Sequence, residues 1–191
     1  SKTNKRFLSF IPWEGVLLGG NVTWIWGAGC ITGDGAFKDT TYPIFESTRE
    51  LSSGVGELLA TAEWDNGGVY VLYSPASNHA QEMGTRLGMT MNSSETFCAL
   101  LEELQVGYDY IASESVAAGA LQKRRARVLF LPYSVALERA VQEQVRKFVQ
   151  GGGIAIADFR PATHTPRGRP VGEGGLDDLF GVKYRQTDNV V

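Results

Sequence analysis

Four polar residues that could do chemistry follow short apolar runs of the sequence: His79, Ser134, Asp158 and Arg160. If those runs are parallel strands, their carboxyl ends meet at one edge of a sheet, where the four side chains could come together. The serine, the histidine and the aspartate could then form a hydrolytic triad with the serine as nucleophile. The aspartate and the arginine could instead hold the polar groups of a bound small molecule.

We favour a structural role for Ser134 over a catalytic one. A nucleophile elbow needs glycines beside the serine, because its strained turn leaves no room for larger side chains. Pro132 and Ala136 flank this serine instead, and its hydroxyl is well placed to cap a following helix. His79 is more simply a helix-start or interface residue. We therefore predict no catalytic residue in this chain.

The sequence predicts neither a cofactor nor a metal site. Gly151 to Gly153 precede an apolar run, whereas a dinucleotide-binding loop follows a strand and opens a helix. No pair of Cys or His residues has the spacing of metal ligands. Cys98 lies in an apolar helical pattern and is predicted to be a small core residue.

The elements that position these residues are clearest between residues 127 and 159. Two apolar runs, Val128 to Leu131 and Ile154 to Ala157, are typical of strands buried on both faces. Between them, apolar residues recur every three or four positions and predict a helix that Ser134 caps and Gly151 to Gly153 end. The three elements form a right-handed βαβ crossover in a parallel sheet.

Two more strands are predicted before this unit, at Val69 to Tyr73 and at Tyr108 to Ile111. Ser74 to Asn78 is expected to be a loop. Helices are predicted at 79–87, 94–105 and 114–118, the second with Phe97, Leu100, Leu101 and Leu104 facing inward. Four strands joined by helical crossovers indicate an α/β domain with a flavodoxin-like doubly wound parallel sheet.

The first third of the chain has a different pattern. It predicts a helix over residues 1–20 interrupted at Pro12, a strand at 21–27, a loop to about residue 43 and a helix over 44–64 that is weak at 52–56. The last helix should bury Leu51, Val55, Leu58, Leu59 and Ala62. The single strand between apolar helices could belong to an extension that adds one edge strand to the following sheet. We favour the closing end of a larger (β/α) barrel.

Alternation along the predicted strand places Trp24 and Trp26 on one face. Indole rings at the end of a barrel strand could stack on the apolar face of a sugar. The alternative is that both rings fill the barrel core. For Trp24 we favour the core, whereas for Trp26, nearer the carboxyl end, both interpretations stay open.

The composition is that of an ordinary soluble protein, with 43% hydrophobic residues, 20% charged residues and a net charge of −3. We expect no nucleic-acid partner, because affinity for phosphates comes mainly from clustered Lys and Arg. No apolar segment approaches the length that spans a bilayer, so we expect no membrane partner. The expected compartment is the cytoplasm.

Several segments carry a resemblance to a known family, in this order: WEGVLLGGNVTWIWG, YPIFESTREL, GGVYVLYSPASNHAQEMG, TFCALLEEL, YDYIASESVAAGAL, VLFLPYSVAL, FVQGGGIAIADFRP and GLDDLFGV. Together they resemble the β-galactosidases of glycoside hydrolase family 42. The resemblance implies that residues 1–64 are the C-terminal end of the (β/α)8 catalytic barrel. It also implies that residues 67–191 are a trimerisation domain of class I glutamine amidotransferase-like fold, truncated at its C-terminus.

In that family two glutamates at the ends of earlier barrel strands act as acid/base and nucleophile, and those strands are not in this sequence. Glu14 precedes the last strand and takes neither role. By the resemblance, Trp26 faces the sugar, and the amidotransferase-like domain has lost its cysteine nucleophile. Tyr133 and Ser134 stand where the elbow would be.

The expected function is therefore that of a fragment of a glycosidase. This part would serve homo-oligomer assembly, as a trimer, and wall the site for the parent enzyme's galactoside substrate rather than hydrolyse it. Two alternatives stay open. One is an amidotransferase-like enzyme with a strand-end serine nucleophile, and the other is a small-molecule binding module of flavodoxin-like fold.

Overall fold

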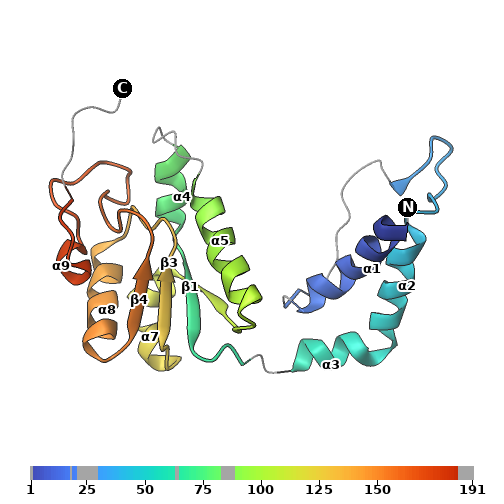
Figure 1. Ribbon diagram of the computed structural model, residues 1–191, viewed down its shortest axis with the longest axis horizontal. Coiled ribbons are helices and arrows are strands. Elements are labelled where there is room, and N and C mark those ends of the chain that lie inside the picture. The colour runs from blue at the N-terminus through green and yellow to red at the C-terminus, as the bar shows by residue number, and fades with distance from the viewer. Residues whose placement is uncertain (1, 18, 21–29, 63–64, 83–88, 185–191) are drawn as a thin grey trace. The chain divides into compact units, whose positions relative to one another are not determined.

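The computed structural model describes residues 2–17, 19–20, 30–62, 65–82 and 89–184 (Figure 1). The chain divides into two compact units, Ser1–Trp64 and Asp65–Val191. The strand predicted at 21–27 lies outside the described residues.

The described part of the first unit is mainly helical, apart from a turn over residues 30–41 in which Ile31 and Phe37 form an antiparallel bridge. Its helices are α1 (Lys2–Leu17), α2 (Tyr42–Glu50), a π-helical turn (Leu51–Val55) and α3 (Gly56–Thr61). Helix α1 packs on α2, and the Ser47 hydroxyl of α2 donates a hydrogen bond of 2.7 Å to the Ser9 carbonyl of α1. Ile44 and Leu51 are the buried apolar residues on the α2 side of this packing.

Two predictions for this unit are wrong. Helix α1 is not interrupted at Pro12 but continues through it, although an interior proline removes one helical hydrogen bond, and the Pro12 side chain is buried. Val55, Leu58 and Ala62 were expected to be buried but are exposed. The predicted weak point is where Gly54 adopts φ +117°, and this break turns the residues that follow away from the stripe that contains Leu51.

The second unit is built on a four-stranded parallel sheet of β1 (Val69–Tyr73), β2 (Asp109–Ala112), β3 (Val128–Leu131) and β4 (Ile154–Ala157). The strand order is β2-β1-β3-β4, and every pairing is parallel. This is the order of a flavodoxin-like sheet, in which the direction of winding reverses between β1 and β3. The predicted fold class is therefore confirmed.

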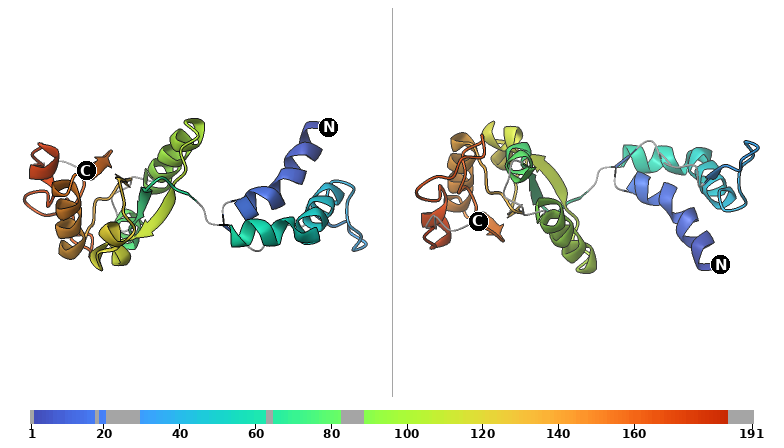
Figure 2. Two further views of the ribbon diagram at one scale, coloured as in Figure 1. Left: turned by 90° about the horizontal axis from the view of Figure 1, so that it is seen from below. Right: turned by 90° about the horizontal axis from the view of Figure 1, so that it is seen from above.

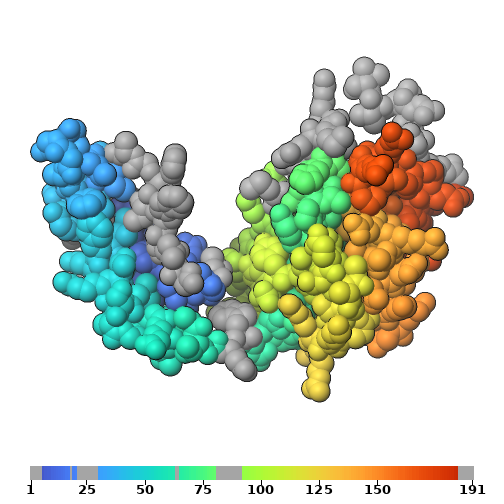
Figure 3. Space-filling model, turned by 180° about the vertical axis from the view of Figure 1, so that it is seen from behind, coloured from blue at the N-terminus to red at the C-terminus, as the bar shows by residue number. Residues whose placement is uncertain are grey.

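Helices cover both faces of the sheet, as a doubly wound fold requires. They are α4 (Pro75–Glu82), α5 (Met89–Glu103), α6 (Ser113–Ala117), α7 (Ala120–Lys123), α8 (Arg139–Gln150) and α9 (Asp177–Phe180). Figure 2 shows α5 and α8 on opposite sides of the strands. Helices α6 and α7 (yellow) pack beside α8 (orange) on the face seen in Figure 3.

Alternation along the strands divides the core into two layers. Val71 and Phe130 point toward α5, where they pack with Cys98 and Leu101. The alternate strand residues form the larger layer with α6, α7 and α8: Tyr70, Leu72, Leu129 and Leu131 against Val116, Leu121, Val141, Val145 and Phe148. Cys98 is thus a small core residue, as predicted.

Strand β4 is not buried on both faces as predicted. Ile154 and Ile156 are 57% and 37% exposed, because β4 ends the described sheet and α5 lies over β1 and β3 instead. Leu100 of α5 and Leu104, directly after that helix, were predicted to face inward but are exposed. An apolar pattern marks a strand or helix face but does not say whether a neighbouring element covers it.

Several element boundaries also differ from the predictions, and two of them bear on the site. Ser74 to Asn78 is not a loop, because α4 begins at Pro75, a residue whose fixed φ favours the first turn of a helix. Helix α8 begins at Arg139 with Glu138 at its N-cap, so Ser134 does not cap it.

The segment between β3 and α8 is extended, and the chain beyond β4 pairs with it. The amides of Ala162 and His164 donate hydrogen bonds of 2.8 Å to the carbonyls of Ser134 and Val135. These two bonds keep residues 134–137 out of the helix and bury Ala136 and Ala162.

Candidate functional site at the carboxyl edge of the sheet

A strained turn follows β3 at the position of a nucleophile elbow. Pro132 ends the strand, and Tyr133 adopts φ +38°, a conformation that bulky residues rarely take. The Tyr133 side chain is 2% exposed and packs with Ala80 of α4 and Val135. The backbone has the positive φ expected of an elbow, but the residue that occupies it is a buried phenol without access to a substrate.

Asp158, which directly follows β4, is hydrogen-bonded to this turn. One carboxylate oxygen of Asp158 accepts a hydrogen bond of 2.8 Å from the Tyr133 amide, and the other accepts one from the Ser93 hydroxyl of α5. The carboxylate thus links β3, β4 and α5 at the carboxyl edge. This use of both oxygens makes Asp158 a positioning group for the turn.

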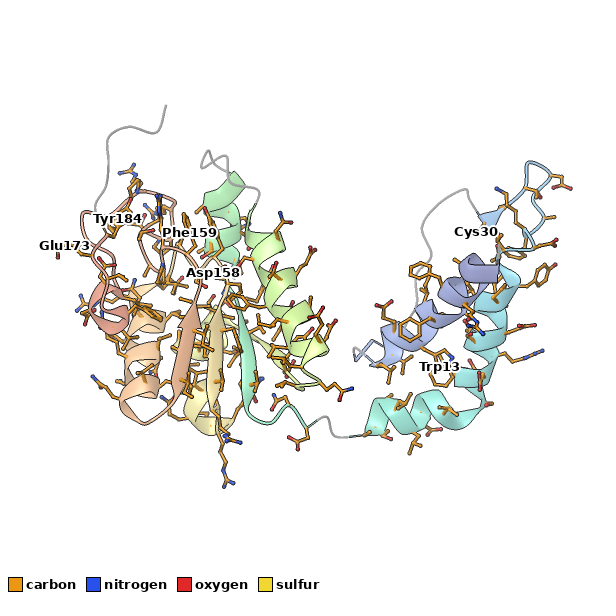
Figure 4. The ribbon with its side chains drawn as sticks, in the orientation of Figure 1. Trp13, Cys30, Asp158, Phe159, Glu173 and Tyr184 are labelled. Atoms are coloured by element: carbon orange, nitrogen blue, oxygen red, sulfur yellow. The ribbon has the colours of Figure 1, made fainter. Side chains whose placement is uncertain are left out.

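Aromatic rings and one guanidinium group stack beside Asp158. The rings of Tyr133 and Phe159 are stacked with centroids 5.4 Å apart and an interplanar angle of 6°. Arg160 places its Cζ 4.8 Å from the Phe159 ring centre and 5.9 Å from that of Tyr184. Asp158, Phe159 and Tyr184 lie on the same side of the unit in Figure 4. Cation–π contacts with two rings hold Arg160 in place at the surface.

His164 lies in the loop that closes this edge. Its Nδ1 is 3.1 Å from the Thr163 hydroxyl, and burial together with the nearby Arg160 charge lowers the pKa of His164 below its ordinary 6.5. Both causes disfavour the protonated ring, so the imidazole is neutral at pH 7.

This lowered pKa predicts a loss of stability on mild acidification. The unfolded chain takes up a proton near pH 6.5 while the folded chain resists it, so the stabilisation is complete above 6.5 and falls as the pH drops toward the folded pKa. We expect the urea midpoint to fall more between pH 7.5 and 5.5 for the unmodified chain than for His164→Gln. Equal slopes in the two proteins would contradict the prediction.

The triad of Ser134, His79 and Asp158, which the sequence disfavours, is not assembled. Ser134 is 1% exposed and its Oγ donates to the Pro132 carbonyl at 3.2 Å, whereas His79 is on the exposed side of α4. Among the residues that the structure describes, no hydrogen bond joins Ser134, His79 and Asp158. Three of the four strand-end candidates lie at the strained turn: Ser134 belongs to it, Asp158 bonds to the Tyr133 amide, and Arg160 lies over the Phe159 ring that stacks on Tyr133.

Trp24 and Trp26 lie outside the described residues, so their predicted role in sugar binding stays a prediction. In the described ranges no group of three or more His, Cys, Asp or Glu residues could hold a metal ion. None of the described helices combines the length and apolar character needed to cross a bilayer.

Sequence reasoning missed the residues that shape the carboxyl edge on the α5 side. Tyr110 of β2 brings its hydroxyl to 3.0 Å from the Cys98 sulfur and 3.3 Å from the Ser94 hydroxyl. Tyr73, the last residue of β1, lies on the same face of the sheet as Tyr110. The sequence did place Tyr73 at the carboxyl end of a predicted strand. That Tyr73 and Tyr110 are neighbours, however, follows only from the register between β1 and β2.

Comparison with known proteins gives one informative result. The sequence matches no family model and no curated protein. The structure is similar to the crystal structure of a β-galactosidase from Bifidobacterium adolescentis, with a TM-score of 0.52 and 15% sequence identity over 65% of this chain. The match spans 56% of that chain. At this identity the likeness concerns the fold, and the fold that this chain shares is one found in a β-galactosidase.

Proposed function

We propose that this chain is part of a β-galactosidase-like glycoside hydrolase and that its α/β unit serves assembly rather than hydrolysis. The observation that carries the proposal is the fold likeness to a β-galactosidase. The ordered segments that resemble glycoside hydrolase family 42 support the same assignment independently, because they come from the sequence alone. The catalytic glutamates would come from barrel strands that this sequence does not contain.

The elbow supports a non-catalytic role for the α/β unit. An amidotransferase needs a reactive side chain at the turn after β3, and here the turn holds the buried ring of Tyr133. The neighbouring Ser134 hydroxyl is bound to the Pro132 carbonyl and is also buried. A nucleophile at either position would have to leave the core before it could reach a substrate.

The exposed apolar residues of the first unit are consistent with the end of a barrel. Phe7 and Phe10 of α1 and Leu58 of α3 are 63%, 51% and 69% exposed. Such side chains are uncommon in helices that face only water and mark surfaces that other parts of a protein cover. In this proposal, the rest of the barrel covers them, and Trp26 faces the sugar.

For the second unit we propose self-association into a trimer in which each subunit forms part of the wall of a neighbouring subunit's sugar site. A closed three-fold ring needs two different surface patches on each copy, because its contacts are heterologous. Among the described residues of this unit, the exposed isoleucines of β4, Leu100 of α5 and Leu104 after it offer apolar surface for such contacts.

The test combines mass and activity measurements on the purified chain. We expect light scattering to give three times the chain mass of 20.8 kDa at high concentration. We also expect no hydrolysis of p-nitrophenyl β-D-galactopyranoside by the chain. A monomer at all concentrations would contradict the assembly role, and hydrolysis would contradict the assignment of catalysis to other strands.

A further inference from the structure

A pocket of about 330 Å³ opens at the carboxyl ends of β1 and β2, beside α5. Its volume is at the lower end of the roughly 300–1,000 Å³ typical of small-molecule sites. The carboxyl edge of a parallel sheet is also where open α/β folds bind their ligands. Both size and place therefore suit a small ligand.

Two tyrosine rings form one side of the pocket. Val71 of β1 pairs with Tyr110 of β2, and alternation places Tyr73 on the same face as Val71, so Tyr73 and Tyr110 are diagonal neighbours. Both side chains are about half exposed, at 50% and 48%. Leu72 and Pro132 add apolar surface to the lining. Ring faces left open in a pocket can stack on the C–H groups of a ligand.

The walls of the pocket are held by hydrogen bonds. The Ser77 hydroxyl donates to the Ala136 carbonyl at 3.0 Å and accepts from the Ala136 amide at 3.1 Å. Tyr110 is fixed through its contacts with Cys98 and Ser94, and burial raises the pKa of its phenol, which stays protonated. A wall fixed in this way costs little ordering when a ligand binds.

The charge of the lining selects among ligand classes. Among the described residues that line the pocket, Glu95 supplies the one carboxylate and there is no Lys, Arg or His. Anionic ligands such as phosphates would meet repulsion without a counter-charge. Asn78 and Ser94 add an amide and a hydroxyl, which match neutral hydroxyl groups.

We propose that this pocket binds a neutral, hydroxyl-rich ring of the size of one pyranose. The ring's C–H face stacks on Tyr73 and Tyr110, and its hydroxyls bond to Asn78, Ser94 and Glu95. This site lies within the α/β unit and does not rest on the proposed assembly role.

The test is a titration of the full chain with methyl β-D-galactopyranoside and methyl β-D-glucopyranoside, followed by backbone amide NMR. We expect saturable shifts confined to residues 73–78, 94–95 and 110–112 for at least one of the two sugars. Tyr110→Ala should weaken binding by about fivefold or more, because it removes a stacking surface. Tyr42→Ala changes a tyrosine of similar exposure in the first unit and should leave the affinity unchanged.

A second variant keeps the test decisive if Tyr110→Ala does not fold. Asn78→Ala alters only the pocket's polar lining and should weaken sugar binding by about threefold or more. Saturable binding of tetramethylammonium without binding of either sugar would overturn the proposal in favour of a cation site. Non-saturable shifts, or shifts spread outside the pocket, would also overturn it. If the unmodified chain binds sugar but stays monomeric, the assembly role is contradicted and the sugar site is not.

Discussion

Replacing Tyr133 by alanine is expected to lower the free energy of unfolding by about 3 kcal/mol, as for other aromatic residues removed from a core. The ring is 2% exposed, stacks on Phe159 and packs with Ala80 and Val135. Its loss leaves a cavity between α4, the elbow and the chain after β4. Urea unfolding followed by circular dichroism measures the change.

The half-exposed Tyr73 provides the matched control. It carries the same side chain at the end of β1 but is 50% exposed, so Tyr73→Ala should cost about 1 kcal/mol or less. If the two variants were equally stable, Tyr133 would not fill the core at the elbow.

The backbone strain at Tyr133 makes a further distinction possible. At φ +38° an alanine retains the strain, whereas glycine adopts positive φ freely. Tyr133→Gly should therefore be more stable than Tyr133→Ala by about 1 kcal/mol, the reverse of the usual order in regular elements. If Tyr133→Ala were instead the more stable of the two variants, the turn would relax to an unstrained φ once the ring is removed.

The strands of the α/β unit could be predicted from local sequence, and β3 and β4 were predicted to the residue. A continuous apolar run closed by Pro132 or Asp158 leaves few alternatives to a strand in a parallel sheet. The start of α8 could not be found in this way. Ser134 has the side chain of an N-cap, but the pairing of residues 134–136 with 162–164 holds it in an extended segment. That pairing joins segments distant in the sequence.

The candidate site was predictable only in its location. The carboxyl ends of parallel strands were the expected place, and Asp158 and Arg160 lie there. The partners of Asp158 were not predictable, since they are the Tyr133 amide and the Ser93 hydroxyl, one a backbone group and the other on α5. Neither the positive φ of Tyr133 nor the contact of Tyr110 with Cys98 has a signature in the local sequence.

The turn from α8 into β4 gives the second large effect. A Cβ at Gly153 would lie 2.6 Å from Cδ2 of Phe148, well inside van der Waals contact. The Phe148 ring is 6% exposed within the larger core layer, so it has little room to move. Gly153→Ala is expected to cost about 2 kcal/mol through overpacking. Gly151→Ala is the control, because a Cβ there would be no closer than 3.3 Å to any neighbour.

A double-mutant cycle separates overpacking from a backbone effect. Phe148→Leu shortens the side chain that the new methyl group would meet, so Gly153→Ala should cost about 1 kcal/mol less in that background. Equal costs in both backgrounds would place the effect in the backbone of the turn. The coupling would show that Gly153 is required because α8 and β4 approach so closely that only a hydrogen fits between the turn and the Phe148 ring.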